Sequence, residues 1–169
     1  MIYAEFARNL HVNMSRVRKR LDDGYELDDD VERVDVDALV TFLTTEAYWG
    51  RWRGRTEIEA QLHSAWRIVA AYQGSKMVGF ARAVSDGVAY AYLADVYVDP
   101  SHRGHGLGLA VVRELVEGNG ADTFRWALHT LDAHGLYAKL GFAPPGPDLL
   151  ERPAPASRRP QPPGVRSSG

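Results

Sequence analysis

The sequence indicates an α/β (α+β) fold in which helices flank a sheet. Two segments with helical spacing come first, three strand-like segments follow, and a glycine-rich turn then leads into another helix. At 169 residues the chain suits a single domain. We expect a flexible N-terminal arm over residues 1–21, a folded domain over 22–149, and a disordered proline-rich tail over 150–169.

The composition excludes several classes of function. With 20 Lys and Arg against 22 Asp and Glu, no general positive field is available to bind nucleic acid. The absence of cysteine excludes a thiol nucleophile and a disulfide framework. The N-terminal residues lack a signal-peptide pattern, and no apolar run approaches the ~20 residues of a membrane helix. We therefore expect a soluble, cytoplasmic protein with neither nucleic-acid nor membrane partners.

The first half of the chain predicts two helices. Asp35 is suited to cap the first, whose apolar face comprises Val36, Leu39, Val40 and Leu43. Thr56 and Glu59 have the spacing of a capping box for the second, which we expect to end near Trp66. The apolar stripe of this helix comprises Ile58, Leu62 and Ala65.

The middle of the chain predicts an antiparallel meander. Residues 67–73, 76–84 and 88–99 are rich in β-branched and aromatic side chains and are separated by glycine-containing turns. A helix is expected after residue 107, ending at Gly118. A further strand over 123–130 and a short helix over 132–140, capped by Asp132, complete the predicted elements.

The segment from Val98 to Gly108 has a phosphate-binding layout, because a strand leads through alternate glycines into a helix. Glycine allows backbone N–H groups to approach an anion, and the helix N-terminus adds partial positive charge. A Rossmann fingerprint would need glycine at position 109, where leucine stands, and no Gly-Lys-Ser/Thr sequence of a Walker loop is present. A tight turn without a ligand is the alternative.

Two motifs resemble the GNAT superfamily of N-acetyltransferases. Arg103, Gly106 and Gly108 fill its Arg/Gln-x-x-Gly-x-Gly/Ala signature, and residues 133–142 resemble its A-x-x-x-Y-x-x-x-G-F helix. The resemblance implies a mixed, mostly antiparallel sheet with a V-shaped splay at the strand that holds acetyl-CoA. The residues implied to bind this co-substrate are Val96, Tyr97, Val98, Arg103, Gly104, His105, Gly106, Leu107, Gly108 and Thr130, where Thr130 replaces a common asparagine.

The resemblance also implies a general acid. Tyr137 occupies the position of the tyrosine that protonates the leaving thiolate, although an aromatic residue that simply packs the helix has the same pattern. For the general base we expect Asp95, whose alternative role is to anchor a neighbouring loop. Glu46 and His129 are reserve candidates.

The acceptor is expected between the first two helices and the sheet. Arg53 and Tyr90 fall within this aromatic-rich region, in which the candidate substrate-binding residues are Tyr48, Trp49, Trp52 and Tyr92. Such residues suit an apolar or aromatic amine. Ordinary packing between helix and sheet is the alternative for about half of them.

The predicted function is transfer of an acetyl group from acetyl-CoA to a primary amine. Without cysteine, direct attack in a ternary complex is expected, and no metal is required. A longer acyl donor and a protein acceptor are open alternatives. From another class of function, the same fold could serve as an acyl-CoA sensor or a partner-binding module. The resemblance also leads us to expect a homodimer.

Overall fold

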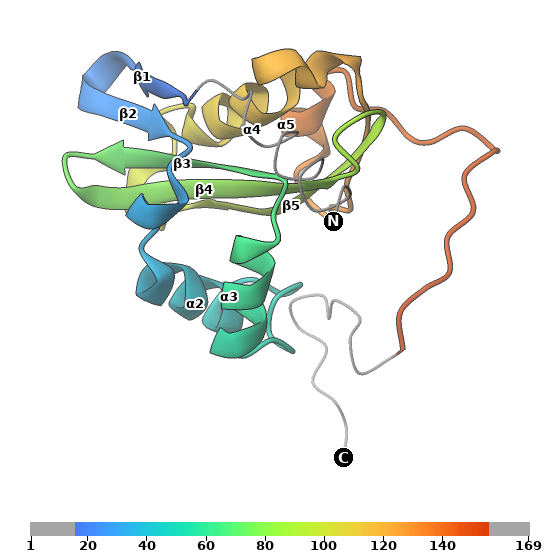
Figure 1. The fold of residues 1–169 in the computed structure, drawn as a ribbon, viewed down its shortest axis with the longest axis horizontal. Helices are drawn as coiled ribbons and strands as arrows, with labels where there is room; N and C mark the ends of the chain where they lie inside the picture. Colours follow the sequence, from blue (N-terminus) through green and yellow to red (C-terminus); the bar gives the residue numbers. More distant parts are fainter. Residues whose placement is uncertain (1–15, 156–169) are drawn as a thin grey trace, which may run out of the picture.

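A computed structural model describes residues 16–155, which form a six-stranded sheet covered by helices on both faces (Figure 1). The strands lie in chain order and pair antiparallel, except that the last pair is parallel. The strands are β1 (Arg18–Arg20), β2 (Tyr25–Asp28), β3 (Arg67–Gln73), β4 (Lys76–Ser85), β5 (Tyr90–Val98) and β6 (Arg125–Ala127). The α-helices are α2 (Val36–Thr45), α3 (Arg55–His63), α4 (Leu107–Glu117) and α5 (His134–Ala138). Short 3-10 turns are η1 (Asp22–Gly24), η2 (Val31–Arg33), η3 (Pro100–His102) and η4 (Gly118–Thr123).

The two faces of the sheet belong to separate cores. Val69, Val78 and Leu93 pack with α4 and α5, whereas Ile68 and Phe80 pack with α2 and α3. Figure 1 shows α4 and α5 above the sheet and α2 and α3 below it. The predicted meander is confirmed as β3, β4 and β5. Successive side chains of a strand point to opposite faces, so these strands contribute to both cores.

The predicted helices are confirmed, but the caps predicted for the second helix and for the short helix over 132–140 are wrong. Asp35 caps α2 as expected, accepting a hydrogen bond from the N–H of Ala38 at 2.9 Å. Helix α3 begins earlier than predicted, with Gly54 as its N-cap and the Glu57 carboxylate accepting from the Gly54 N–H at 2.9 Å. Of the predicted apolar stripe, Ile58 and Leu62 are buried.

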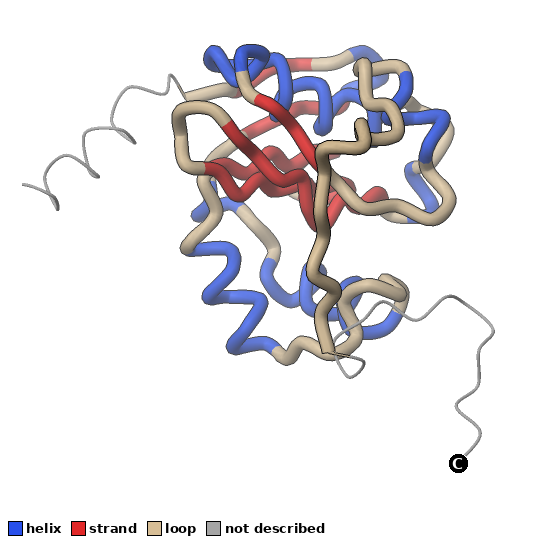
Figure 2. Tube along the Cα trace, turned by 90° about the vertical axis from the view of Figure 1, so that its right-hand side faces the viewer, coloured by secondary structure: helices blue, strands red, loops and turns tan. Residues whose placement is uncertain are grey.

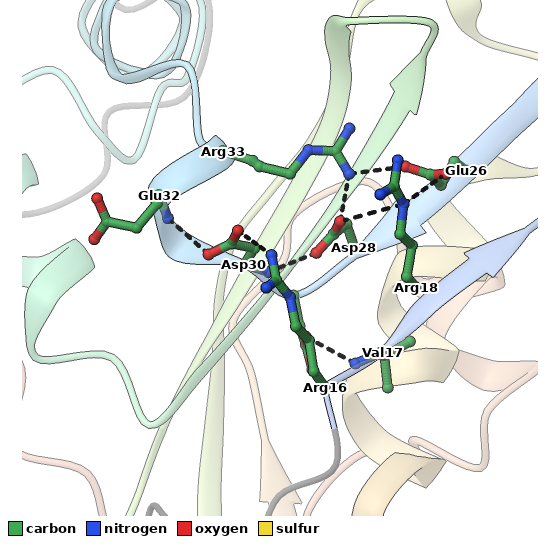
Figure 3. Close-up of polar contacts among 9 residues, drawn as sticks. Arg16, Val17, Arg18, Glu26, Asp28, Asp30, Glu32 and Arg33 are labelled. Atoms are coloured by element: carbon green, nitrogen blue, oxygen red, sulfur yellow. Dashed lines mark hydrogen bonds and ion pairs between the residues drawn. The ribbon is translucent and has the colours of Figure 1, made fainter.

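The ends of the described chain refine the predicted domain limits. Strand β1 falls within the range predicted as an arm, so the sheet begins before residue 22. Ion pairs attach this edge to its neighbours, with Arg18 and Arg33 both bound to Glu26 at 3.0 and 2.7 Å (Figure 3). At the other end, residues 150–155 are exposed and form no helix or strand. The remaining residues of the predicted arm and tail lie outside the described range.

A β-bulge interrupts the alternation of β5. Phe80 pairs with Tyr97 and Arg82 pairs with Ala94, so two residues of β5 lie opposite one of β4. Asp95 in this bulge has φ of 52°, in the left-handed region. The extra residue leaves Ala94 and Asp95 both facing the α2–α3 side. Among residues 16–155, no helix has the length and apolar character needed to cross a bilayer.

Candidate active site

Strands β5 and β6 separate after three residue pairs. Tyr90, Ala91 and Tyr92 pair with residues 125–127, and no described strand pairs with this edge of β5 from 93 to 98. The expected splay is therefore present. It exposes backbone hydrogen-bonding groups of β5 beside the loop that leaves its end.

The loop after β5 is fixed at its start by Asp99. The Asp99 carboxylate accepts from the N–H of Ser101 at 2.9 Å and from Lys76 Nζ at 2.8 Å, and Lys76 and Ser101 together hold the pKa of Asp99 below its usual range. Gly104 and Gly106 then adopt φ of 86° and 73°, and a Cβ on either would meet no atom within 4 Å. The loop backbone is therefore open to a ligand at the N-terminus of α4.

A hollow of about 440 Å³ lies between this loop and α5. Six predicted co-substrate residues line it: Val98, Arg103, Gly104, Gly106, Leu107 and Gly108. The side chains of two others lie elsewhere, because His105 packs on Tyr25 with ring centroids 5.5 Å apart and Tyr97 packs on Phe42 with ring centroids 4.0 Å apart. Thr130 accepts from the Ala133 N–H at 3.1 Å, so its hydroxyl supports the start of α5, where Asp132 was wrongly predicted as the cap.

Four further lining residues were missed from the sequence: Leu109, Gly135, Leu136 and Lys139. The last three share one face of the α5 turn, and Tyr137 occupies the opposite face. Their spacing within the predicted helix could show that they share a face, but not that this face borders the loop. Gly108 has a second role, since a Cβ there would lie 3.2 Å from Leu136 Cδ1. Close packing of α4 against α5 therefore requires its glycine.

Tyr137 lies in α5, close enough to Tyr48 and Tyr92 for their charges to act on it. Its ring is 9% exposed and belongs to the core below α4 and α5, with Phe142 packed on its edge. Burial raises its pKa to about 12, and the charges of Tyr48, Asp132 and Tyr92 contribute to the increase. Among the described residues, its hydroxyl makes no hydrogen bond. This phenol remains protonated at neutral pH and is available to donate.

Asp95 forms a buried ion cluster instead of facing an open site. Arg53 binds both carboxylate oxygens at 2.9 and 2.8 Å, and Arg82 Nε donates at 2.7 Å. Trp49 Nε1 adds a bond of 3.2 Å. Burial opposes ionisation, but the two arginines outweigh it and lower the pKa of Asp95. These contacts match the anchoring interpretation, because a carboxylate held by two cations is a weak base.

Comparison with known proteins agrees with this geometry. Residues 27–142 match the acetyltransferase (GNAT) family. The chain belongs to the GNAT family. A solved GNAT acetyltransferase from Xanthomonas campestris pv. campestris aligns with a TM-score of 0.74 and 29% identity, covering 79% of this chain and 96% of that one. The GNAT fold and its mixed sheet are thereby confirmed.

Two curated plant proteins are similar to parts of this GNAT chain. GCN5-related N-acetyltransferase 1, chloroplastic, from Arabidopsis thaliana is 34% identical over 56% of this chain and 48% of its own length. Serotonin N-acetyltransferase 2, chloroplastic, from Oryza sativa subsp. japonica is 42% identical over 44% of this chain and 38% of its own length. The chain spans less than half the length of either relative. Together with the family match, they support acyltransferase activity.

The predicted acceptor residues of this GNAT domain lie in three different surroundings. Trp49 is committed to packing, because it binds Asp95 and contacts Phe42 and Tyr48. Tyr48 accepts from the Leu131 N–H at 3.1 Å and Tyr92 contacts His129, so both lie near the gap between β5 and β6. Trp52 is 41% exposed on the loop between α2 and α3.

The described part of the GNAT chain contains no group of three or more His, Asp or Glu residues arranged to hold a metal. Glu46, a reserve candidate for the base, is exposed at the C-terminal end of α2. His129, the other reserve candidate, lies beside Tyr92.

Proposed function

We propose that this GNAT chain transfers an acetyl group from acetyl-CoA to a primary amine in a ternary complex. The observation that carries the proposal is the arrangement of the loop hollow, the splayed edge of β5 and the Tyr137 hydroxyl around one gap in the sheet. The donor then approaches from the α4–α5 side and the acceptor from the α2–α3 side. Direct transfer needs no cysteine nucleophile.

The loop fits the diphosphate of coenzyme A. Gly104 and Gly106 leave their backbone accessible, the α4 N-terminus provides positive partial charge, and Arg103 and Lys139 border the same hollow. The free edge of β5 at residues 96–98 would hold the pantetheine arm by backbone hydrogen bonds. Bound acetyl-CoA supplies an activated thioester.

Tyr137 is the proposed general acid. With its pKa raised to about 12, the phenol holds its proton throughout the neutral range and would donate it to the departing thiolate. The ring of Tyr137 also packs in the core, and this packing holds the proposed acid in place.

The acceptor is proposed to be a small apolar or aromatic primary amine. Tyr48 and Tyr92 border the gap, and the exposed ring of Trp52 lies on the neighbouring loop. Aromatic rings bind such amines through apolar contact and attract their cationic form. The name of the rice relative, a serotonin N-acetyltransferase, refers to an amine of this class.

Ligand-dependent stability and thiol release together test the function. Acetyl-CoA at about 100 times its Kd should add about 2.7 kcal/mol to apparent stability, and an amine panel should then release free thiol. Tyr137→Phe should lower kcat about a hundredfold while nearly preserving acetyl-CoA affinity.

Tyr72→Phe is the matched control, because the Tyr72 hydroxyl is buried without a hydrogen-bond partner among the described residues. Its turnover should equal that of the wild type. Stabilisation without thiol release from any amine would indicate an acyl-CoA sensor, and no stabilisation would reject both functions.

A further inference from the structure

Three side chains form a row beside the gap between β5 and β6, linked by one hydrogen bond and one ion pair. The Tyr92 hydroxyl lies 2.9 Å from His129 Nδ1, and His129 Nε2 lies 3.3 Å from Glu151 Oε2. They come from β5, the residues after β6 and the C-terminal segment. In Figure 2 this segment crosses in front of the sheet as a tan tube towards the helices below. Segments distant in sequence therefore converge at this row.

The row lies on the proposed acceptor side. Tyr92 pairs with Ala127 in the last step before the strands separate, and Tyr92 raises the pKa of Tyr137, the proposed acid. Val84 lies opposite Tyr92 on β4 and is 46% exposed, so this face is not covered by core packing. An amine placed at the gap would reach the Tyr92 hydroxyl from this face.

The hydrogen-bond roles are determined by Glu151. A carboxylate only accepts, so it favours the histidine tautomer with hydrogen on Nε2. Nδ1 is then the acceptor for the Tyr92 hydroxyl. The oxygen of Tyr92 retains lone pairs that can accept from a third group. This order of donors and acceptors conducts a proton in one direction, towards the imidazole.

We propose that Tyr92, His129 and Glu151 form a proton relay that neutralises the amine acceptor of the proposed acetyltransferase. An ammonium N–H bond breaks as its proton passes to Tyr92 Oη, and the original Tyr92 proton passes to His129 Nδ1. The products are a neutral amine, an unchanged phenol and an imidazolium paired with Glu151. Tyr92 is the residue that touches substrate, His129 accepts the proton through it, and Glu151 positions the imidazole. The inference rests on the proposed function.

Other charged groups around the row do not replace this acceptor. Burial raises the pKa of Tyr92, and the charges of Asp95 and Glu151 act in the same direction, whereas Arg82 and the contact with His129 lower it. Asp95 is already bound by two arginines. Asp132, in the turn before α5, acts on Tyr48 and Tyr137. Glu151 is thus the carboxylate in direct contact with the imidazole.

Stability does not explain the pair. The side chains of His129 and Glu151 are 63% and 60% exposed, and ion pairs at such positions contribute little to folding. Substitutions in the row are therefore expected to fold normally. Any loss of turnover can then be assigned to impaired proton transfer rather than to unfolding.

The pH dependence of kcat/KM tests the relay, with one amine and saturating acetyl-CoA. His129→Gln should lower kcat/KM about a hundredfold and remove the limb that titrates with the imidazole. Glu151→Gln should also lower kcat/KM, because the imidazolium loses its anionic partner. Tyr92→Phe should match His129→Gln, and the double variant should lose no more than either single variant.

Asp148→Asn is the matched control, because Asp148 ties the same C-terminal segment to Arg125 at 3.3 Å without touching the row. It should leave the pH profile unchanged. Retention of the limb in His129→Gln, or additive losses in the double variant, would reject the relay while wild-type turnover upholds the acetyltransferase. Absence of wild-type turnover with every amine would reject both.

Discussion

Asp95 shows how one backbone angle changes the role of a side chain. Strict alternation would direct this carboxylate towards the core below α4, where it would have no partner. The bulge at φ of 52° turns it to the other face, where Arg53 and Arg82 neutralise it. The same cluster attaches the loop between α2 and α3 to β5. We therefore expect Asp95 to anchor the proposed acceptor side rather than to take a proton.

Asp95→Asn should lower the free energy of unfolding by about 3 kcal/mol, because two buried arginines lose their counter-charge. Urea denaturation measures the change. Asp37→Asn is the matched control: it breaks the exposed pair with Arg55 and should leave the free energy of unfolding nearly unchanged.

The pH dependence of this stability has a definite sign. The folded pKa of Asp95 is lowered, so its contribution is present above the unfolded pKa and is lost as the pH falls through the folded value. A stable Asp95→Asn variant without turnover would contradict the anchoring role and restore Asp95 as a candidate base.

The loop and α4 form the element on which the proposed donor binding depends. Gly106 is the N-cap of α4 with φ of 73°, an angle that alanine adopts only under strain. A methyl group there would also project into open space beside the hollow. Both the backbone angle and the access of a ligand therefore favour glycine at this position.

Gly106→Ala should weaken acetyl-CoA binding at least about tenfold by calorimetry, which corresponds to about 1.4 kcal/mol. Gly120→Ala is the matched control beyond the other end of α4, because Gly120 has φ of 78° and a methyl group on it would meet no atom within 4 Å. It should lose similar stability but retain affinity. Equal affinity in both variants would show that the loop does not hold the diphosphate.

Local sequence patterns predicted the helices, strands and loop. The features that were not predicted depend on contacts between residues far apart in the chain. Strands β3 to β5 and the loop glycines are encoded by alternation, turn residues and spacing within a few positions. The bulge at Asp95 carries no glycine to mark it, and its stabilising partner Arg53 lies far back in the chain. Likewise, Lys139 joins the hollow because α5 packs on α4, which no local pattern specifies.

The two cores together frame the gap in the sheet at which we propose that the reaction takes place. One core supports the donor hollow and Tyr137, and the other supports the ion cluster of Asp95. Because β6 leaves β5 after Tyr92, groups from both sides meet without a cavity through either core. This division of the fold suits the proposed ternary complex, in which donor and acceptor would enter separately.

Backbone amide NMR during titration with coenzyme A tests this arrangement most directly. We expect the largest ¹H–¹⁵N shift changes at residues 103–108 and in β5 at 96–98, with little change at Gly74 and Gly120. Changes concentrated instead around Arg67 and Trp66, which line a second hollow of about 400 Å³, would contradict the assignment of the loop as the donor site.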